Sequence, residues 1–232
     1  VETAAAAAET LVLDAKGVLA GRVSAQGRVS GRMLEGEQYA AHGLAWLATY
    51  ATALTEMAGW AKRLEAEGRL GETERLILAI GAGEYLAQIE GGIAMSQGEV
   101  VRPHDIGLAP EQCRAMRTQQ VDDLVRHGNT DAARMRLATL LAEQEGAATF
   151  GDCGLDEEFE MVRDQFRRFA ADKVTPYAHE WHLKDELVPM EIVEEMAELG
   201  VFGLTIPEEH GGFGMGKTAM CVVSEELSRG YI

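Results

Sequence analysis

The sequence has 232 residues, of which 47% are hydrophobic and 25% charged, enough to bury a core in one or two domains. Its net charge of −17 repels phosphate groups, so we expect neither nucleic acid nor an anionic membrane as a partner. No apolar stretch reaches the roughly 20 residues that cross a bilayer, and the first residues lack the basic and apolar parts of a signal peptide. These features predict a cytoplasmic protein without a membrane span.

The cysteines and histidines do not form a metal-binding pattern. Cys113, Cys153 and Cys221 stand far apart without a CxxC pair, which indicates free thiols rather than a zinc site or a disulfide framework. His179 and His182 share one face of a predicted helix, but the spacing supplies no third ligand. We therefore predict no metal site.

Residues 1–36 are predicted to form an irregular or partly helical leader. Residues 1–10 are rich in alanine and favour a helix. The glycines at positions 17, 21, 27 and 31 argue against a long stable helix after that, unless packing against a partner overrides their low helix propensity.

Residues 37–150 are predicted to form a helical extension. Between residues 37 and 67, apolar residues recur three and four positions apart, which is typical of one long amphipathic helix. A second helix follows, with apolar residues on two faces, so it must be packed on more than one side. The glycines at positions 68 and 71 make the two helices an antiparallel hairpin. Small residues in the second helix would allow close approach to a neighbour: Ala82, Gly83, Gly91 and Gly92.

The rest of the extension is predicted to be a loop over 99–110 and two further helices. The third helix begins near Pro110 and runs to Gly128, and the fourth is capped by Asn129 or Thr130 and ends at Gly146. The residues expected to face inward in the fourth helix are Ala133, Leu137, Leu140, Leu141 and Gln144. Four helices in hairpin order indicate a bundle, and the glycines near residues 146–155 mark the domain boundary.

Residues 151–232 are predicted to form a second helical domain. Asp156 caps a helix with a stripe of large apolar residues, namely Phe159, Val162, Phe166 and Phe169, which favours a core position over a cofactor site. A helix opened by Pro189 ends at Gly200, and residues 201–206 read as a short buried extended segment. A glycine-rich turn over 208–216 then leads to a helix that begins near Lys217.

This succession of elements resembles the amino-terminal helical domain of flavin-dependent acyl-CoA dehydrogenases. The resemblance rests on FRRFAADKVTPYAHEW at 166–181, on PMEIVEEMAELGVFGLTIPEEHGGFG at 189–214 and on SEELSRG before the end of the sequence. The glycine turn is followed by neither a Walker lysine–serine pair nor a ribose-binding acid, so it matches no phosphate-binding motif. The predicted fold is all-α, a helical-bundle extension followed by an incomplete amino-terminal helical domain of an acyl-CoA dehydrogenase.

The extension carries a second resemblance. The segments HGLAWLATYATAL at 42–54 and GEYLAQIEGGIAMSQGEVVRP at 83–103 are similar to the extension of those family members that oxidise methylsuccinyl-CoA to mesaconyl-CoA. The resemblance implies α,β-dehydrogenation of a short, branched, dicarboxylic acyl-CoA, with FAD as the cofactor. It also implies an electron-transferring flavoprotein as the electron acceptor and a homo-oligomeric enzyme.

The family resemblance places the catalytic base and most flavin contacts in domains that this sequence does not contain, so no catalytic residue is assigned. It implies that the amino-terminal domain forms one wall of the acyl pocket, with Phe213, Thr218, Val222 and Tyr231 as candidate substrate-binding residues. The most prominent carboxylates, those of Glu84 and of the pair at 225–226, are expected to be structural or solvated.

Two alternatives remain open at this point. The enzyme could act on another short or branched acyl-CoA, or the helices could form a non-catalytic interaction or oligomerisation module. The sequence begins at Val1 without a methionine and ends directly after a helix. We therefore expect it to be part of a longer polypeptide.

Overall fold

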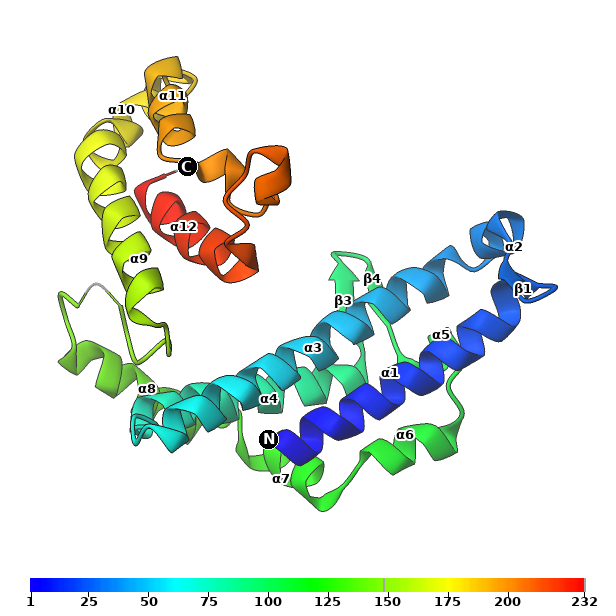
Figure 1. Ribbon diagram of the computed structural model, residues 1–232. Helices are drawn as coiled ribbons and strands as arrows, with labels where there is room; N and C mark the ends of the chain where they lie inside the picture. Colours follow the sequence, from blue (N-terminus) through cyan, green and yellow to red (C-terminus); the bar gives the residue numbers. More distant parts are fainter. Residues whose placement is uncertain (148, 232) are drawn as a thin grey trace. The chain divides into compact units, whose positions relative to one another are not determined.

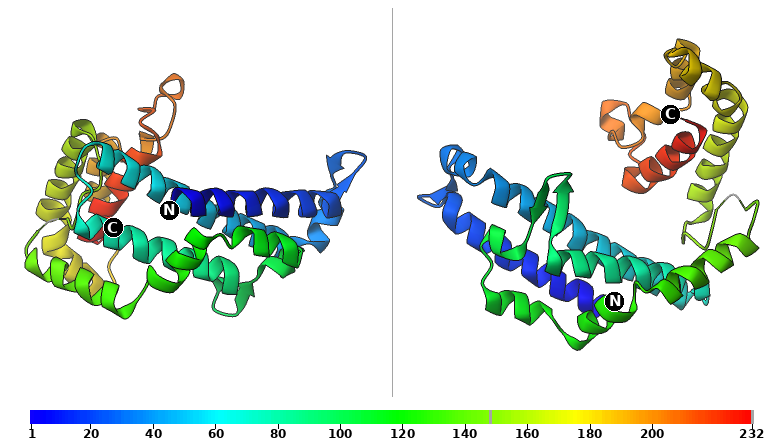
Figure 2. Two further views of the ribbon diagram at one scale, coloured as in Figure 1. Left: turned by 90° about the horizontal axis from the view of Figure 1, so that it is seen from below. Right: turned by 180° about the vertical axis from the view of Figure 1, so that it is seen from behind.

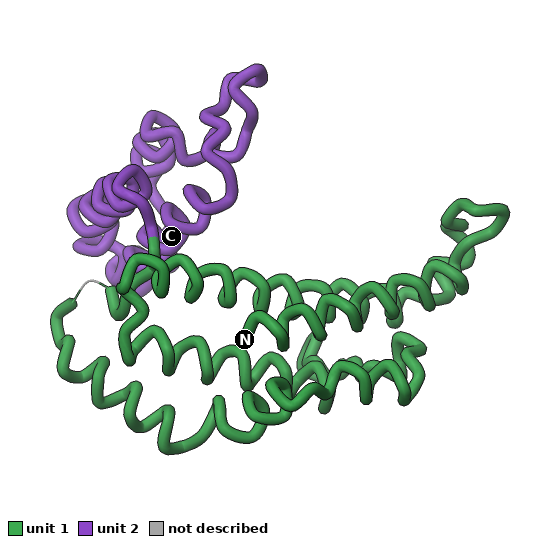
Figure 3. The backbone as a smooth tube through the Cα atoms, turned by 60° about the horizontal axis from the view of Figure 1, so that its bottom comes forward, with its two compact units in different colours: residues 1–154 green, residues 155–232 purple. Residues whose placement is uncertain are grey.

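The computed structural model describes residues 1–147 and 149–231, and the chain divides into two compact units, residues 1–154 and 155–232 (Figure 3). Both units are built from helices joined by short connections, and the two short two-stranded hairpins of the described residues lie in the first unit (Figure 1). The predicted all-α class is confirmed. Among the described residues, no helix combines the length and the hydropathy needed to cross a bilayer.

The first unit consists of eight helices and two small hairpins within the part of the chain that the structure describes. The helices are α1 (Glu2–Val23), α2 (Gly31–Gly36), α3 (Gln38–Ala66), α4 (Glu72–Gly91), α5 (Pro103–Ile106), α6 (Pro110–Met116), α7 (Gln119–His127) and α8 (Asp131–Glu143). Strands β1 (Ser24–Ala25) and β2 (Arg28–Val29) pair antiparallel, as do β3 (Ile93–Ser96) and β4 (Glu99–Val101).

Helix α1 lies alongside α3 for much of its length (Figures 1 and 2). Its buried residues recur at helical spacing: Ala4, Ala5, Ala8, Leu11, Ala15, Leu19 and Val23. A Cβ atom added at Gly17 or Gly21 would meet nothing within 4 Å, so both glycines face away from the packed side. The glycines do not prevent a long helix over residues 2–23, because burial of the apolar face against α3 overrides their low helix propensity, the exception that the sequence analysis allowed.

Helices α3 and α4 are the long helices that the apolar pattern predicts. Helix α3 buries residues of the predicted stripe, including Leu47, Ala51, Leu54, Ala58 and Ala61. Helix α4 approaches α7 so closely that a Cβ atom at Gly83 would lie 2.6 Å from the carbonyl oxygen of Leu124. The small residue at position 83 is therefore required by the packing.

The predicted single helix over 110–128 is wrong, because the chain breaks into α6 and α7 at residues 117 and 118. The Thr118 hydroxyl accepts a hydrogen bond from the Val121 amide at 3.3 Å and starts a new helix, which is the ordinary function of an N-cap residue. The predicted loop over 99–110 contains strand β4 and helix α5. Thr130 caps α8, whose predicted inward face is half-buried.

The second unit consists of α9 (Glu157–Phe169), a π-helical turn η1 (Ala170–Val174), α10 (Thr175–Lys184), α11 (Met190–Glu198), short 3₁₀ turns η2 (Val201–Gly203) and η3 (Glu208–His210), and α12 (Gly216–Gly230). Asp156 caps α9 by accepting a hydrogen bond from the Phe159 amide at 3.0 Å. Phe166 and Phe169 of the predicted stripe are buried against residues of α10, α11 and α12.

The predicted buried extended segment over 201–206 is wrong. Residues 201–203 form the η2 turn, and only Leu204 of the six residues is buried. Gly200 takes a left-handed conformation with φ 82°, and the tight turn that follows leaves Phe202 exposed. The glycines on either side favour a compact turn over an extended strand.

Candidate functional site

The glycine-rich turn before α12 is held by backbone hydrogen bonds between its two arms. The amides of Phe213, Gly214 and Met215 donate to the carbonyl oxygens of residues 203, 206 and 204, at 3.0, 2.9 and 2.9 Å. A Cβ atom at Gly212 would lie 2.1 Å from the Ile206 carbonyl oxygen, so only glycine allows the two arms to approach this closely. The turn is therefore a rigid support for the residues that follow it.

Phe213 lies over two glycines of the neighbouring turn. Cβ atoms added at Gly200 and Gly203 would lie 2.5 and 3.2 Å from its ring. The residue as a whole keeps 55% of its surface exposed. Its inner side is thus fixed by contact with the backbone, while its outer side is free to contact a ligand or another domain.

Helix α12 places Thr218 and Val222 one turn apart on the same face. Thr218 is exposed and Val222 is buried, whereas Val223 and Leu227 point into the core of the unit. Thr218 can therefore contact a ligand directly, and Val222 can only shape the surface beneath it.

Tyr231 follows the carboxyl end of α12, with φ 131°. Its ring meets the ring of His182 edge-on, with centroids 6.3 Å apart. Both residues line a cavity of about 400 Å³ between α10 and the end of α12, together with His179 and Arg229. The cavity has hydroxyl, imidazole and guanidinium groups that can bind a polar or anionic group.

The four candidate substrate-binding residues are spread along one helix. Phe213 precedes α12 and Tyr231 follows it, and 15 helical residues rise by about 22 Å. The structure brings Thr218 close to Val222 but does not gather all four candidates around one cavity of this unit. An acyl pocket that used all of them would have to extend along the whole helix.

A buried ionic cluster joins α9 to α12. The Glu226 carboxylate has 1% of its surface exposed and accepts hydrogen bonds from Arg167 at 2.9 and 3.1 Å. These bonds raise the pKa of the Arg167 guanidinium. The buried Arg163 guanidinium lies 4.0 Å from the same carboxylate. Glu225 is exposed, so of the two neighbouring acids one is solvated and the other holds the helices together.

Glu84 in the first unit is part of a hydrogen-bonded chain. Its carboxylate accepts from Gln88 at 2.7 Å and from Asn129 at 2.6 Å, and Tyr50 donates to Gln88 at 2.7 Å. Hydrogen bonds from Gln88 and Asn129 lower the pKa of Glu84. A catalytic base needs a raised pKa, so this carboxylate serves the structure.

The described residues contain no group of three metal-ligating side chains. Within residues 1–147 and 149–231 the strands are two to four residues long, and none leads through a glycine-rich loop into a helix, the arrangement that cradles a dinucleotide pyrophosphate.

Comparison with known proteins identifies the second unit. Residues 156–232 match the family described as "Acyl-CoA dehydrogenase, N-terminal domain". This segment is an acyl-CoA dehydrogenase amino-terminal domain, and the resemblance seen in its sequence is confirmed.

Individual proteins of known name are similar to longer stretches of the chain or to the second unit alone. Over 224 residues the chain is 59% identical to "(2S)-methylsuccinyl-CoA dehydrogenase" of Cereibacter sphaeroides, an alignment that covers 97% of this chain and 40% of the relative. "Glutaryl-CoA dehydrogenase" of Desulfococcus multivorans is 41% identical over 34% of this chain and 21% of its own length. "Short-chain specific acyl-CoA dehydrogenase, mitochondrial" of Rattus norvegicus is 37% identical over 33% of this chain and 18% of its own length. The chain thus spans at most two fifths of these relatives.

Proposed function

We propose that this chain is part of an FAD-dependent acyl-CoA dehydrogenase that converts methylsuccinyl-CoA to mesaconyl-CoA. The observation that carries the proposal is the 59% identity to (2S)-methylsuccinyl-CoA dehydrogenase, which runs through both units and covers 97% of the chain. The glutaryl-CoA and short-chain enzymes match only about a third of it. The extension therefore separates the methylsuccinyl-CoA enzyme from these two relatives.

In this reaction a proton leaves the α-carbon of the thioester and a hydride leaves the β-carbon, and bound FAD supplies the electron acceptor. The present chain supplies neither the base nor the flavin site under this proposal. Its part is to form one wall of the acyl pocket, with Thr218 and Phe213 near the start of α12, Val222 beneath and Tyr231 beyond its end. These side chains would orient the acyl group and exclude water.

The apolar surface of the second unit supports a role within a larger enzyme. Leu183, Leu187 and Met190 expose 71%, 91% and 64% of their surfaces around the connection between α10 and α11. Large apolar side chains gathered in one region mark a surface that other polypeptide covers. Further parts of the dehydrogenase, including the part that binds FAD, are the partners that this proposal requires.

Three further features belong to the same proposal. The substrate is bound as its CoA thioester, an electron-transferring flavoprotein receives the electrons, and the enzyme is a cytoplasmic homo-oligomer. The acidic charge of this chain means that basic groups elsewhere in the enzyme must hold the phosphates of CoA.

A chimeric enzyme tests the proposal. The segment of the Cereibacter sphaeroides enzyme that aligns with this chain is replaced by this chain, and the purified protein is examined for flavin absorbance. A yellow protein that oxidises methylsuccinyl-CoA is expected. A folded, colourless chimera would contradict the proposal and favour the second candidate, a non-catalytic helical interaction module. A yellow chimera that prefers another short or branched acyl-CoA would instead correct the substrate.

A further inference from the structure

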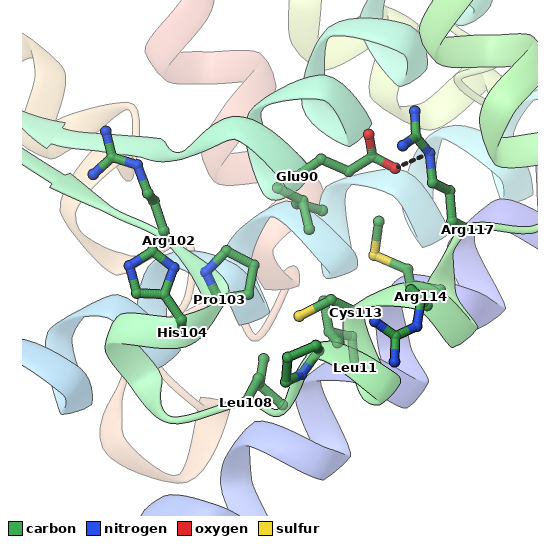
Figure 4. Close-up of a pocket in the computed structure, with 12 residues that line it drawn as sticks. Leu11, Glu90, Arg102, Pro103, His104, Leu108, Cys113, Arg114 and Arg117 are labelled. Carbon is green, nitrogen blue, oxygen red and sulfur yellow. Dashed lines mark ion pairs between the residues drawn. The ribbon is translucent and has the colours of Figure 1, made fainter.

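A cavity in the first unit is not used by the proposed dehydrogenase chemistry. It has a volume of about 410 Å³, near the lower end of the range of small-molecule sites. Its lining comes from α1, α4, α5 and α6 and from the chain next to them (Figure 4). A cavity of this size suits a small metabolite and is too small for a whole acyl-CoA.

The cavity has basic groups on two opposite sides. Arg102 and His104 lie together on one side and Arg114 and Arg117 on the other (Figure 4). The whole chain has 21 basic against 38 acidic residues, so three arginines and a histidine around one cavity stand out from the acidic composition. They attract negative charge only where carboxylates of the chain do not already neutralise them.

Two of the arginines already have carboxylate partners. Arg117 pairs with Asp122 at 2.7 Å and with Glu90 at 3.3 Å, and Arg114 pairs with Glu111 at 2.5 Å. Among the residues that the structure describes, no carboxylate lies within ion-pair distance of the Arg102 guanidinium. The exposed Arg102 is therefore the cation that remains available to a ligand, whereas Nε2 of the neighbouring His104 lies 3.4 Å from the Asp105 carboxylate.

The remainder of the lining is apolar. Leu11, Leu108 and Met116 are buried side chains that form part of the wall. The Cys113 sulfur points toward the interior, between the two basic sides (Figure 4). An apolar wall beside one available guanidinium matches a ligand with a short hydrocarbon body and a single charged head.

We propose that this cavity binds a small organic monocarboxylate, with its carboxylate on Arg102 and its hydrocarbon part against Leu11, Leu108 and Met116. Glu90 also lines the cavity, and its negative charge disfavours a doubly charged head such as a phosphate ester. The inference does not depend on the proposed function, because every residue that it uses lies in the first unit.

Cys113 provides a direct test in the full chain. In a variant that carries Cys153→Ser and Cys221→Ser, Cys113 is the remaining thiol, and its alkylation by the uncharged reagent N-ethylmaleimide is followed by mass spectrometry. Hexanoate should slow the alkylation in a saturable way. Hexanamide, which has the same body without the charge, and inorganic phosphate should have much weaker effects.

Arg102→Gln should weaken hexanoate protection by about tenfold, the size expected for losing one charge-assisted contact. Arg126→Gln is the matched control, because Arg126 is an exposed arginine of the same unit outside the cavity and its replacement changes the net charge equally. It should leave protection unchanged. Circular dichroism checks that both variants fold, and isothermal calorimetry of hexanoate binding gives a second readout independent of the thiol.

Several outcomes would overturn the proposal. If hexanoate neither protects Cys113 nor gives a binding isotherm, the cavity is not a carboxylate site. Equal protection by hexanamide would show that the cavity recognises only apolar groups. Stronger protection by inorganic phosphate or butyl phosphate would assign the site to phosphate compounds. An Arg102→Gln variant that folds and binds hexanoate normally would exclude the proposed orientation.

Discussion

Arg167 and Glu226 form a two-point hydrogen-bonded ion pair across the second unit, with donor–acceptor distances of 2.9 and 3.1 Å. The two residues lie 59 positions apart in the sequence and join α9 to α12. Because α12 begins at the glycine turn and ends next to Tyr231, this pair fixes the helix that carries the proposed wall of the acyl pocket.

Glu226→Ala should therefore destabilise the second unit strongly. Removing the carboxylate deprives Arg167 of both hydrogen bonds to Glu226 and takes one nearby negative charge from Arg163, which keeps its pair with Glu160 at 3.1 Å. Breaking one partner of a buried pair typically costs about 3–5 kcal/mol. Urea denaturation followed by circular dichroism measures the loss.

Glu225→Ala is the matched control, because it removes an exposed carboxylate from the neighbouring position of the same helix. It should change the free energy of unfolding by no more than about 0.5 kcal/mol. Equal losses for the two variants would show that Glu226 acts only through the charge of the helix and not through the buried pair.

Gly83→Leu should destabilise the first unit. A Cβ atom at this position would lie 2.6 Å from the Leu124 carbonyl oxygen and 3.0 Å from the Asn129 amide nitrogen. Both are backbone atoms that cannot rotate away, and overpacking of this kind typically costs about 1–3 kcal/mol. A lower thermal midpoint is expected. An unchanged or higher midpoint would mean that α4 and α7 are not packed as described.

Gly17→Ala should stabilise the first unit, the opposite of the effect expected for Gly83→Leu. Gly17 lies within α1, and a Cβ atom there would meet nothing within 4 Å. Replacing a helical glycine with alanine at an unobstructed site stabilises a protein by about 0.5–1 kcal/mol. A higher thermal midpoint would support a continuous α1, and a lower one would contradict it.

The contrast between these two glycines shows what the sequence alone can predict. The regular apolar stripes predicted α3 and α4 because helical periodicity is a local property. The length of α1 could not be predicted in the same way, because it depends on a buried face packed against α3. The break before Thr118 was missed because threonine is found both within helices and at their caps.

The sites are harder to predict than the helices, because they combine residues that are distant in the chain. Glu225 and Glu226 look alike in the sequence, and only the position of Arg167 on another helix distinguishes them. The basic cavity of the first unit brings Leu11 close to Arg102 and Cys113. No sequence motif connects these residues.

Glu84 should contribute to the pH dependence of stability. Hydrogen bonds from Gln88 and Asn129 lower its pKa below 4.5 in the folded protein. Its contribution is therefore fully present above about pH 4.5 and is lost as the pH falls through the folded-state pKa. The stability difference between wild type and Glu84→Gln should be constant at neutral pH and shrink in acid. A difference that grows in acid would contradict this assignment.

The proposed wall residues can be tested in the chimeric enzyme. Thr218 and Tyr231 are exposed, so Thr218→Ala and Tyr231→Leu should leave the thermal midpoint nearly unchanged. If both residues contact the acyl group, the variants should change kcat/KM for methylsuccinyl-CoA relative to butyryl-CoA. Lys217→Ala, an exposed position beside Thr218, is the control. An unchanged ratio in both variants would remove these residues from the pocket.

The rate at which the chimera oxidises methylsuccinyl-CoA, compared with the unmodified Cereibacter sphaeroides enzyme, tests the central claim most directly. The present chain alone should be helical, colourless and inactive, because the proposal places the base and the flavin site in other parts of the enzyme. Joined to the remaining part of the relative, it should restore kcat/KM to within about tenfold of the parent enzyme, a loss of at most ~1.4 kcal/mol in transition-state stabilisation. A folded chimera without flavin or activity, or a yellow and active chain on its own, would contradict the account.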